Sequence, residues 1–236
     1  MLPPFCTAPA AATARRRSAG LTLVSLLVVL AVGALLAALV LIPLASVQRQ
    51  ARLTVCLNNL QRVNQAVLSF STDHSGILPG LTDSTAGELQ WWYKEQVKSY
   101  VGLKGASSAG DAVFACPDDR GYSDPQPFYQ GQRFDYGSYN FNGVQLIGAP
   151  NIAATAAATI TEPKRTLLTM EWTAHGPLSW HRSRTGRQNH PFYRDAESVL
   201  GFVDGHVSLT KIYYDGYTPA YLRDPIPGYD YRYSGH

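Results

Sequence analysis

The longest apolar stretch of the chain lies near its N-terminus. Residues 21–42 read LTLVSLLVVLAVGALLAALVLI and include no charged side chain. At the helical rise of about 1.5 Å per residue, a segment of this length crosses about 30 Å of hydrocarbon. A secretory signal has a shorter apolar core of about 7 to 15 residues. The pattern therefore predicts a membrane-spanning helix that the mature protein keeps.

The segment that follows has the period of an amphipathic helix. Its apolar side chains recur three or four residues apart, at Leu53, Leu57, Leu60, Val63, Val67 and Phe70. No linker separates this stripe from the apolar stretch, so we predict one helix over about residues 21–71. Gly33 interrupts its sequence, and Pro43 is expected to kink it. The turn residues of 73–80 predict its end.

A short basic leader precedes this helix. Residues 15–17 are three arginines, Gly20 follows, and no charged residue occurs again before Arg49. The basic flank orients the chain with its N-terminus in the cytoplasm and everything after the apolar stretch across the membrane. The combination of leader, glycine, uncharged run and continuous helix resembles the prepilin-type N-terminal methylation segment of type IV pilins and type II secretion pseudopilins.

The resemblance implies a processing step and a division of the chain. A membrane peptidase would cut between Gly20 and Leu21 and would N-methylate the new first residue. The chain would then comprise a prepilin leader at 1–20, a transmembrane and amphipathic pilin helix at 21–72, and an extracytoplasmic α+β domain at 73–236.

One position departs from the resemblance. The family usually has glutamate as the fifth residue after the cut, where its carboxylate pairs with the N-terminal amine of a neighbouring subunit; here the residue is Ser25. A carboxylate buried in a bilayer needs a partner, which in the family is this amine. Ser25 has no charge and cannot form that pair. Two interpretations follow, a minor subunit that tolerates the loss or an anchored chain that does not polymerise in the usual way.

Charge and cysteine content narrow the class of protein further. The 236 residues include 20 Lys and Arg against 17 Asp and Glu, with no long basic block, so we expect no nucleic-acid partner. Loss of the leader removes three arginines and leaves 17 charges of each sign. It also removes Cys6 and leaves Cys56 and Cys116 in an oxidising compartment, where an even pair favours a disulfide.

The composition changes beyond the long helix, because all 14 tyrosines lie from Tyr93 onward. Residues 88–103 have helical spacing, and we assign their aromatic side chains to the core. Residue types and turns favour β-structure in 112–116, 133–147, 165–172 and 196–214. The expected fold class is α+β, a pilin-like long N-terminal helix, membrane half plus amphipathic half, packed on an antiparallel β-sheet.

The strongest strand signal is a hairpin with Asp204 and Gly205 at its turn. A two-residue type I′ turn there would place Phe202 opposite Val207 and Leu200 opposite Leu209, which gives one apolar face.

The same hairpin extends the resemblance. FVDGHVSL, with His206 after the turn, resembles the closing motif of a group of pseudopilin-like proteins whose C-terminal domain is named for a histidine, nine residues and Asp-Gly; FACPDD and YNFNG resemble its central segments. The position ten residues before Asp204 is Arg194, and the nearest upstream histidine is His190. This offset from the pattern indicates an insertion or the loss of the histidine's role.

Several side chains invite a metal or catalytic interpretation. The candidates are His175, His181, His190, His206 and the loop acids Asp118, Asp119, Asp124 and Asp135. The chain has no H-E-x-x-H or C-x-x-C motif and no EF-hand spacing, and GASSAG has Ala109 where a nucleophile elbow needs glycine. We therefore predict no catalytic residue, no bound metal and no cofactor, with the histidines at the surface or in loops and the acids in solvated turns.

These observations predict a structural subunit without enzymatic activity, a minor pseudopilin of a type II secretion pseudopilus or type IV pilus-like fibre. Its partners would be other pilin or pseudopilin subunits, the prepilin peptidase and the bacterial inner membrane, with the C-terminal domain in the periplasm. An alternative is a membrane-anchored periplasmic domain that binds a ligand or carbohydrate through tyrosine and tryptophan. An anchored metal hydrolase is a third. An exposed aromatic strip would favour binding, and converging histidines would favour catalysis.

Overall fold

A computed structural model gives the fold of most of the chain. It describes residues 22–81, 89–121, 126–144, 146, 148–175, 178–181, 196–213, 222–224 and 226–236, without the side chains of 38–45, 89 and 90. Gly20, Leu21, Asp124, His190 and Arg194 lie outside the described residues. Residues 1–46 and 47–236 form two compact units.

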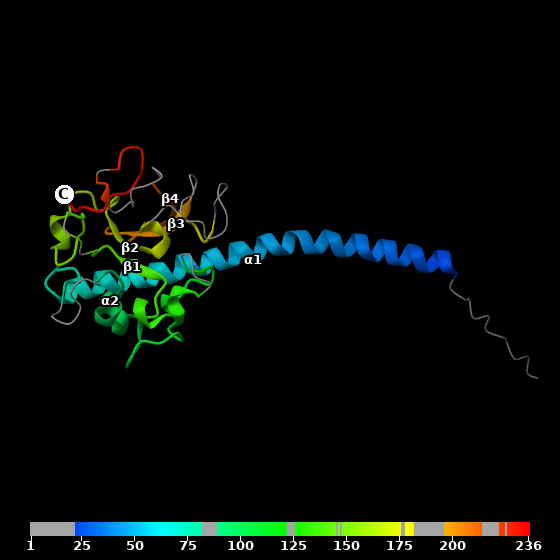
Figure 1. The fold of residues 1–236 in the computed structure, drawn as a ribbon, viewed down its shortest axis with the longest axis horizontal. Coiled ribbons are helices and arrows are strands. Elements are labelled where there is room, and N and C mark those ends of the chain that lie inside the picture. The colour runs from blue at the N-terminus through cyan, green and yellow to red at the C-terminus, as the bar shows by residue number, and fades with distance from the viewer. Residues whose placement is uncertain are drawn as a thin grey trace, which may run out of the picture. The chain divides into compact units, whose positions relative to one another are not determined.

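Helix α1 extends from Leu23 to Asp73 without a break at Pro43 (Figure 1). The hydroxyl oxygen of Thr22 caps its start by accepting a hydrogen bond from the backbone N–H of Ser25 at 3.2 Å. At its end, Gly76 has a φ of 82° and donates its N–H to the carbonyl of Ser71 at 2.8 Å, a helix-terminating contact that glycine favours. The apolar and amphipathic patterns therefore belong to a single helix.

The structure describes only part of the predicted membrane span at residues 21–42. Leu21 and the side chains of residues 38–45 lie outside the described set. Within the part of the chain that is described, no helix combines the length and the hydropathy of a membrane crossing.

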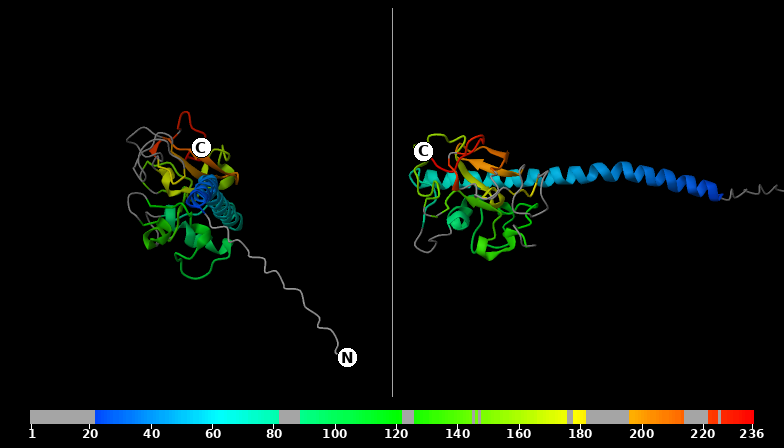
Figure 2. Two further views of the ribbon diagram at one scale, coloured as in Figure 1. Left: turned by 90° about the vertical axis from the view of Figure 1, so that its right-hand side faces the viewer. Right: turned by 45° about the horizontal axis from the view of Figure 1, so that its top comes forward.

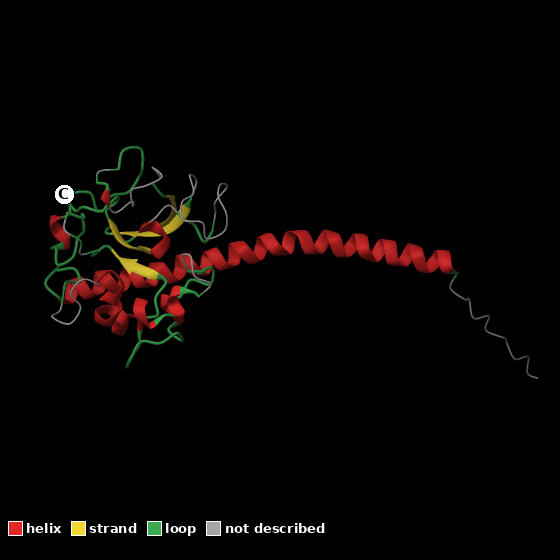
Figure 3. Ribbon diagram, in the orientation of Figure 1, coloured by secondary structure: helices red, strands yellow, loops and turns green. Residues whose placement is uncertain are grey.

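Four strands form one antiparallel sheet in the order β1-β2-β3-β4 (Figure 3). Strands that are adjacent in the sheet are also consecutive in the sequence, and every pair is antiparallel. The strands are β1 (Tyr139–Phe141), β2 (Leu167–Glu171), β3 (Glu197–Phe202) and β4 (Val207–Lys211). The fold is α+β, with the N-terminal helix packed against a four-stranded antiparallel sheet.

The predicted register of the β3–β4 hairpin is wrong by one residue. The structure pairs Gly201 with Val207, Leu200 with Ser208 and Val199 with Leu209. A type I′ turn needs a positive φ at both central residues, and only Gly205 of the pair has one, at 96°. Residues 203–205 instead form a three-residue loop, closed by a hydrogen bond from the N–H of Phe202 to the carbonyl of His206 at 3.0 Å.

Successive positions of β2 and β3 are apolar, so the sheet has two apolar faces. Towards α1, a core cluster contains side chains from the helix and the sheet, including Leu60, Val63, Val67, Phe141, Leu168 and Val199. On the other face, a second cluster contains strand and C-terminal side chains, including Leu167, Met170, Leu200, Phe202, Tyr231 and Tyr233. The amphipathic stripe predicted for residues 53–70 supplies the helix side of the first cluster.

Shorter helices complete the folded unit. Helix α2 (Leu89–Val97) packs against β1, and its Tyr93 ring stacks on Phe141 with 5.8 Å between centroids. Viewed along α1, strands β3 and β4 lie on a different side of that helix from the green segment around residues 112–134 (Figure 2). The 3₁₀ helices are η1 (Lys98–Val101), η2 (Ala112–Phe114), η3 (Phe128–Gln130), η4 (Gln132–Phe134), η5 (Ala157–Thr159) and η6 (Trp172–His175).

The strand predicted at 112–116 is therefore wrong. Asn59 on α1 donates its side-chain amide to the carbonyls of Ala112 at 3.0 Å and Ala115 at 2.9 Å. These contacts take the place of a strand partner, and the 3₁₀ turn directs Val113 and Phe114 into the core.

Candidate functional site

Cys56 and Cys116 lie together beside the C-terminal half of α1. Cys56 is on the helix and Cys116 follows η2, and both are fully buried. Their sulfur atoms are 2.16 Å apart and their Cα atoms 4.8 Å apart, across a sequence separation of 60 residues. This arrangement is within the Cα distance of about 7 Å that a disulfide requires.

Four polar side chains adjoin the disulfide and form what we call the His181 cluster: Arg52, Asp118, Glu171 and His181. His181 Nε2 is 2.7 Å from Glu171 Oε1, and His181 Nδ1 is 3.1 Å from Asp118 Oδ2. Arg52 Nε donates to Asp118 Oδ1 at 2.7 Å. Cys116 Sγ is 4.0 Å from His181 Nε2, so the cluster and the disulfide are in contact.

The electrostatics of the His181 cluster follow from its burial. Glu171 has no exposed surface and the His181 side chain is 2% exposed. Burial lowers the pKa of His181, but the carboxylates of Glu171 and Asp118 outweigh it and raise that pKa to about 9. Burial raises the pKa of Asp118, while His181 and Arg52 lower it below its usual value overall. Around neutral pH His181 is therefore an imidazolium in contact with the side chains of Glu171 and Asp118.

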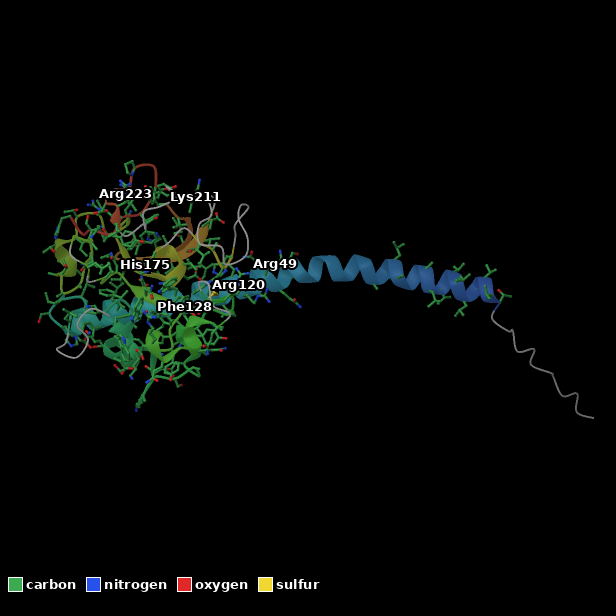
Figure 4. The ribbon with its side chains drawn as sticks, viewed as in Figure 1. Arg49, Arg120, Phe128, His175, Lys211 and Arg223 are labelled. Carbon is green, nitrogen blue, oxygen red and sulfur yellow. A yellow bond between two sulfur atoms is a disulfide. The ribbon has the colours of Figure 1, made fainter. Side chains whose placement is uncertain are left out.

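The prediction of surface or loop histidines is wrong for His175, which is buried in η6, and correct for His206. His181 does lie in a loop, but its side chain is buried. His206 is exposed and its Nδ1 contacts Asp204 Oδ1 at 2.6 Å. His175 is buried, and Asn140 donates its amide to His175 Nδ1 at 2.9 Å. Figure 4 places His175 among the side chains of the folded unit. Both buried histidines have partners from distant segments, which sequence spacing does not reveal.

The solvated-turn interpretation of the loop acids is likewise wrong for Asp119 and Asp135, which are buried. Asp119 accepts hydrogen bonds from the Gly121 N–H at 2.8 Å and the Ser138 hydroxyl at 2.7 Å, and burial raises its pKa to about 6. Burial raises the pKa of Asp135 to about 7. Asp118 instead contacts His181. The three acids described here therefore have different partners.

The buried position of His175 predicts acid sensitivity. Burial lowers its pKa from 6.5 to about 4, so the unfolded chain takes up a proton that the folded chain does not. Its contribution to stability is full above pH 6.5 and is lost as the pH falls to about 4, a loss of about 3 kcal/mol. The neutral groups Asn140 and Tyr233 face the ring. Asp119 and Asp135, whose pKa values burial raises to about 6 and about 7, change the stability in the opposite sense over the same range. The loss is therefore measured as the difference between denaturant titrations of the unaltered chain and of a variant without the imidazole.

The matched variant for this measurement is His175→Asn, which keeps a polar group near the position of Nδ1 but does not titrate. At neutral pH its free energy of unfolding should be lower than that of the unaltered chain, and the difference should shrink by about 3 kcal/mol as the pH falls from 6.5 to about 4. A difference that stays constant over this range would contradict the assignment.

Polar contacts between α1 and the β-sheet with its β3–β4 loop are structural features that the sequence analysis did not predict. Asn64 on α1 donates its amide to the carbonyl of Phe202 at 3.0 Å and accepts the hydroxyl hydrogen of Thr169 at 2.7 Å. Gln61 donates to the carbonyl of Gly205 at 2.9 Å. The one available signal was Asn64 itself, a polar residue beside Val63 within the apolar stripe.

The N-terminal part of α1 exposes apolar side chains. Leu23, Val24, Leu26, Leu27, Val28 and Leu30 are each more than half exposed in the single chain. The Ser25 hydroxyl lies 2.8 Å from the Thr22 hydroxyl, the group that caps the helix. Exposed apolar patches are typical of surfaces that contact a membrane or another protein.

The aromatic strip that would favour ligand binding is absent from the described part of the chain. Every described phenylalanine, tryptophan and tyrosine is buried or half-buried. Trp172 and Phe128, for example, stack on one another with 4.4 Å between ring centroids. These aromatic side chains belong to the core and its margin.

The comparisons with known proteins point to the N-terminus. The family model described as the prokaryotic N-terminal methylation motif matches residues 15–41, which include the basic leader, Gly20 and the start of α1. No curated protein and no solved structure matches the chain. The motif indicates a type IV pilin-like or pseudopilin-like protein, processed by prepilin peptidase and assembled with other pilin subunits, and it favours a structural subunit over an enzyme.

Proposed function

We propose that the chain is a minor pseudopilin, a low-copy structural subunit of a type II secretion pseudopilus or a related type IV pilus-like fibre. The methylation motif at residues 15–41 is the observation that carries the proposal. The motif leads directly into α1, whose C-terminal half packs on the sheet of the α+β unit. A single element thus joins the processed end to the folded unit.

Before assembly, the apolar half of α1 anchors the chain in the bacterial inner membrane, with the folded unit in the periplasm. The peptidase cuts between Gly20 and Leu21. Once the subunit leaves the bilayer, the exposed apolar side chains from Leu23 to Leu36 become buried against the helices of neighbouring subunits. This burial favours assembly, because each Å² of apolar surface removed from water contributes about 25 cal/mol of free energy.

Ser25 supports the minor role. A buried charge pair that loses one partner costs about 3 to 5 kcal/mol, and a serine cannot neutralise the N-terminal amine of a neighbour. The Ser25 hydroxyl lies next to Thr22 of its own helix instead. A subunit of this kind assembles poorly with copies of itself and depends on partner subunits.

The test is expression of the chain with the peptidase, alone and together with a major pilin. We expect no fibres from the chain alone, and fibres by electron microscopy after Ser25→Glu. Ser25→Gln is the matched control, because it has the size of glutamate without its charge and should not restore fibres. Abundant homopolymer from the unaltered chain would contradict the minor role.

A further inference from the structure

Four potential metal ligands converge next to α1 from segments far apart in the chain. Cys56 is on the helix, Cys116 follows η2, Glu171 ends β2, and His181 follows Trp180. One ligand atom from each of these side chains lies within 4.8 Å of the others. Two sulfurs, an imidazole nitrogen and a carboxylate oxygen are donors typical of a four-coordinate Zn²⁺ site.

The side chains around these four are arranged as in a metal site. His181 uses Nε2 towards Glu171 and Cys116, while its Nδ1 is held by Asp118. A carboxylate that binds the second ring nitrogen of a histidine is the common outer contact of zinc ligands. Glu171 Oε2 accepts the Val199 N–H at 2.8 Å, which leaves Oε1 directed into the cluster.

We propose that Cys56, Cys116, Glu171 and His181 bind one Zn²⁺ when the disulfide is reduced. The disulfide and the metal site use the same two sulfur atoms, so they exclude one another. A protein dithiol supplies two electrons and two protons to the disulfide and becomes a disulfide itself. Zn²⁺ then displaces one proton from each cysteine thiol and the Nε2 proton of His181.

The geometry of the folded unit suits this exchange. Bond lengths to Zn²⁺ of about 2.0 to 2.3 Å place tetrahedral ligand atoms about 3.3 to 3.8 Å from one another. His181 Nε2 is already 4.0 Å from Cys116 Sγ and 2.7 Å from Glu171 Oε1. Reduction frees the two sulfurs to move apart. All four side chains are buried, as in a structural site with no open coordination position.

The experiment uses the full-length chain in detergent, reduced with a phosphine and titrated with Co²⁺ and then Zn²⁺. We expect one Co²⁺ per chain, with sulfur-to-cobalt charge-transfer absorption and tetrahedral visible bands that Zn²⁺ abolishes. The oxidised chain should give neither signal. A folded, reduced chain without these bands would overturn the proposal.

Variants separate the site from incidental thiol binding. His181→Gln should remove the tetrahedral spectrum, and Asp118→Asn should weaken Zn²⁺ affinity by about 10- to 100-fold through the lost second contact of His181. The matched control is His206→Gln, at an exposed histidine. It should leave the tetrahedral spectrum and the Zn²⁺ affinity unchanged. Equal affinity in His181→Gln and His206→Gln would contradict the assignment.

Reduction itself could unfold the chain, so far-ultraviolet circular dichroism is recorded in parallel. If the reduced chain loses structure, Zn²⁺ should restore it in the unaltered protein and fail to do so in His181→Gln. A reduced chain that stays unfolded with Zn²⁺ would equally overturn the proposal.

Discussion

Gly201→Ala is expected to lower the free energy of unfolding by about 3 kcal/mol. A Cβ atom at this position would lie 2.6 Å from Asn64 Oδ1 and 2.7 Å from Thr169 Oγ1. Overpacking of a core costs about 1 to 3 kcal/mol. Displacing Asn64 would also break its hydrogen bonds to Thr169 and Phe202, and a buried group left unsatisfied costs about 1 to 3 kcal/mol. Denaturant titration measures the change.

The matched control is Gly110→Ala. The nearest atom to a Cβ at that position is Ser108 Oγ at 3.5 Å, an ordinary contact, so its stability should change by less than about 0.5 kcal/mol. Equal effects of the two substitutions would contradict the close approach of α1 to β3. Asn64→Ala in the same measurement should be destabilising without any overpacking.

Replacing both cysteines of the Cys56–Cys116 pair by serine is expected to destabilise the folded unit by about 4 kcal/mol. The cross-link closes a loop of 60 residues, and the chain-entropy relation gives this value for a loop of that length. Thermal or denaturant unfolding of the oxidised protein and the double variant gives the difference.

The matched control is Cys6→Ser, a substitution in the predicted leader, which should leave the stability of the folded unit unchanged. Non-reducing peptide mapping of membrane-derived protein should recover Cys56 and Cys116 as one linked peptide pair. Recovery of both as free thiols, or a double variant as stable as the unaltered chain, would contradict this role for the pair.

The long helix and the α+β class could be predicted because their signals are local. The apolar positions from Leu53 to Phe70 recur at helical spacing, and the structure places them on the core side of α1. The turn at Asp204 and Gly205 is also visible in the sequence. The register of the hairpin is not visible in the sequence. Asp204 is compatible with the backbone angles of a two-residue loop and with those of a three-residue loop, so its identity does not distinguish them.

The His181 cluster could not be predicted, because it is made by contacts between distant segments. His181 and Asp118 are 63 positions apart, and Arg52 is 66 positions from Asp118. Sequence spacing finds ligands on one helix or one loop, and these side chains come from a helix, a strand end and two loops. The same reason applies to Asn64, whose partners in β2 and β3 lie more than 100 positions away.

The mass of the N-terminal peptide of membrane-derived protein tests the central claim most directly. The chain is expressed with prepilin peptidase, digested, and its N-terminal peptide is measured by mass spectrometry. A pilin-type subunit predicts a chain that begins at N-methylated Leu21, without the 20-residue leader. A mature protein that retains Met1, or one that is cut after Ala45, would contradict the claim.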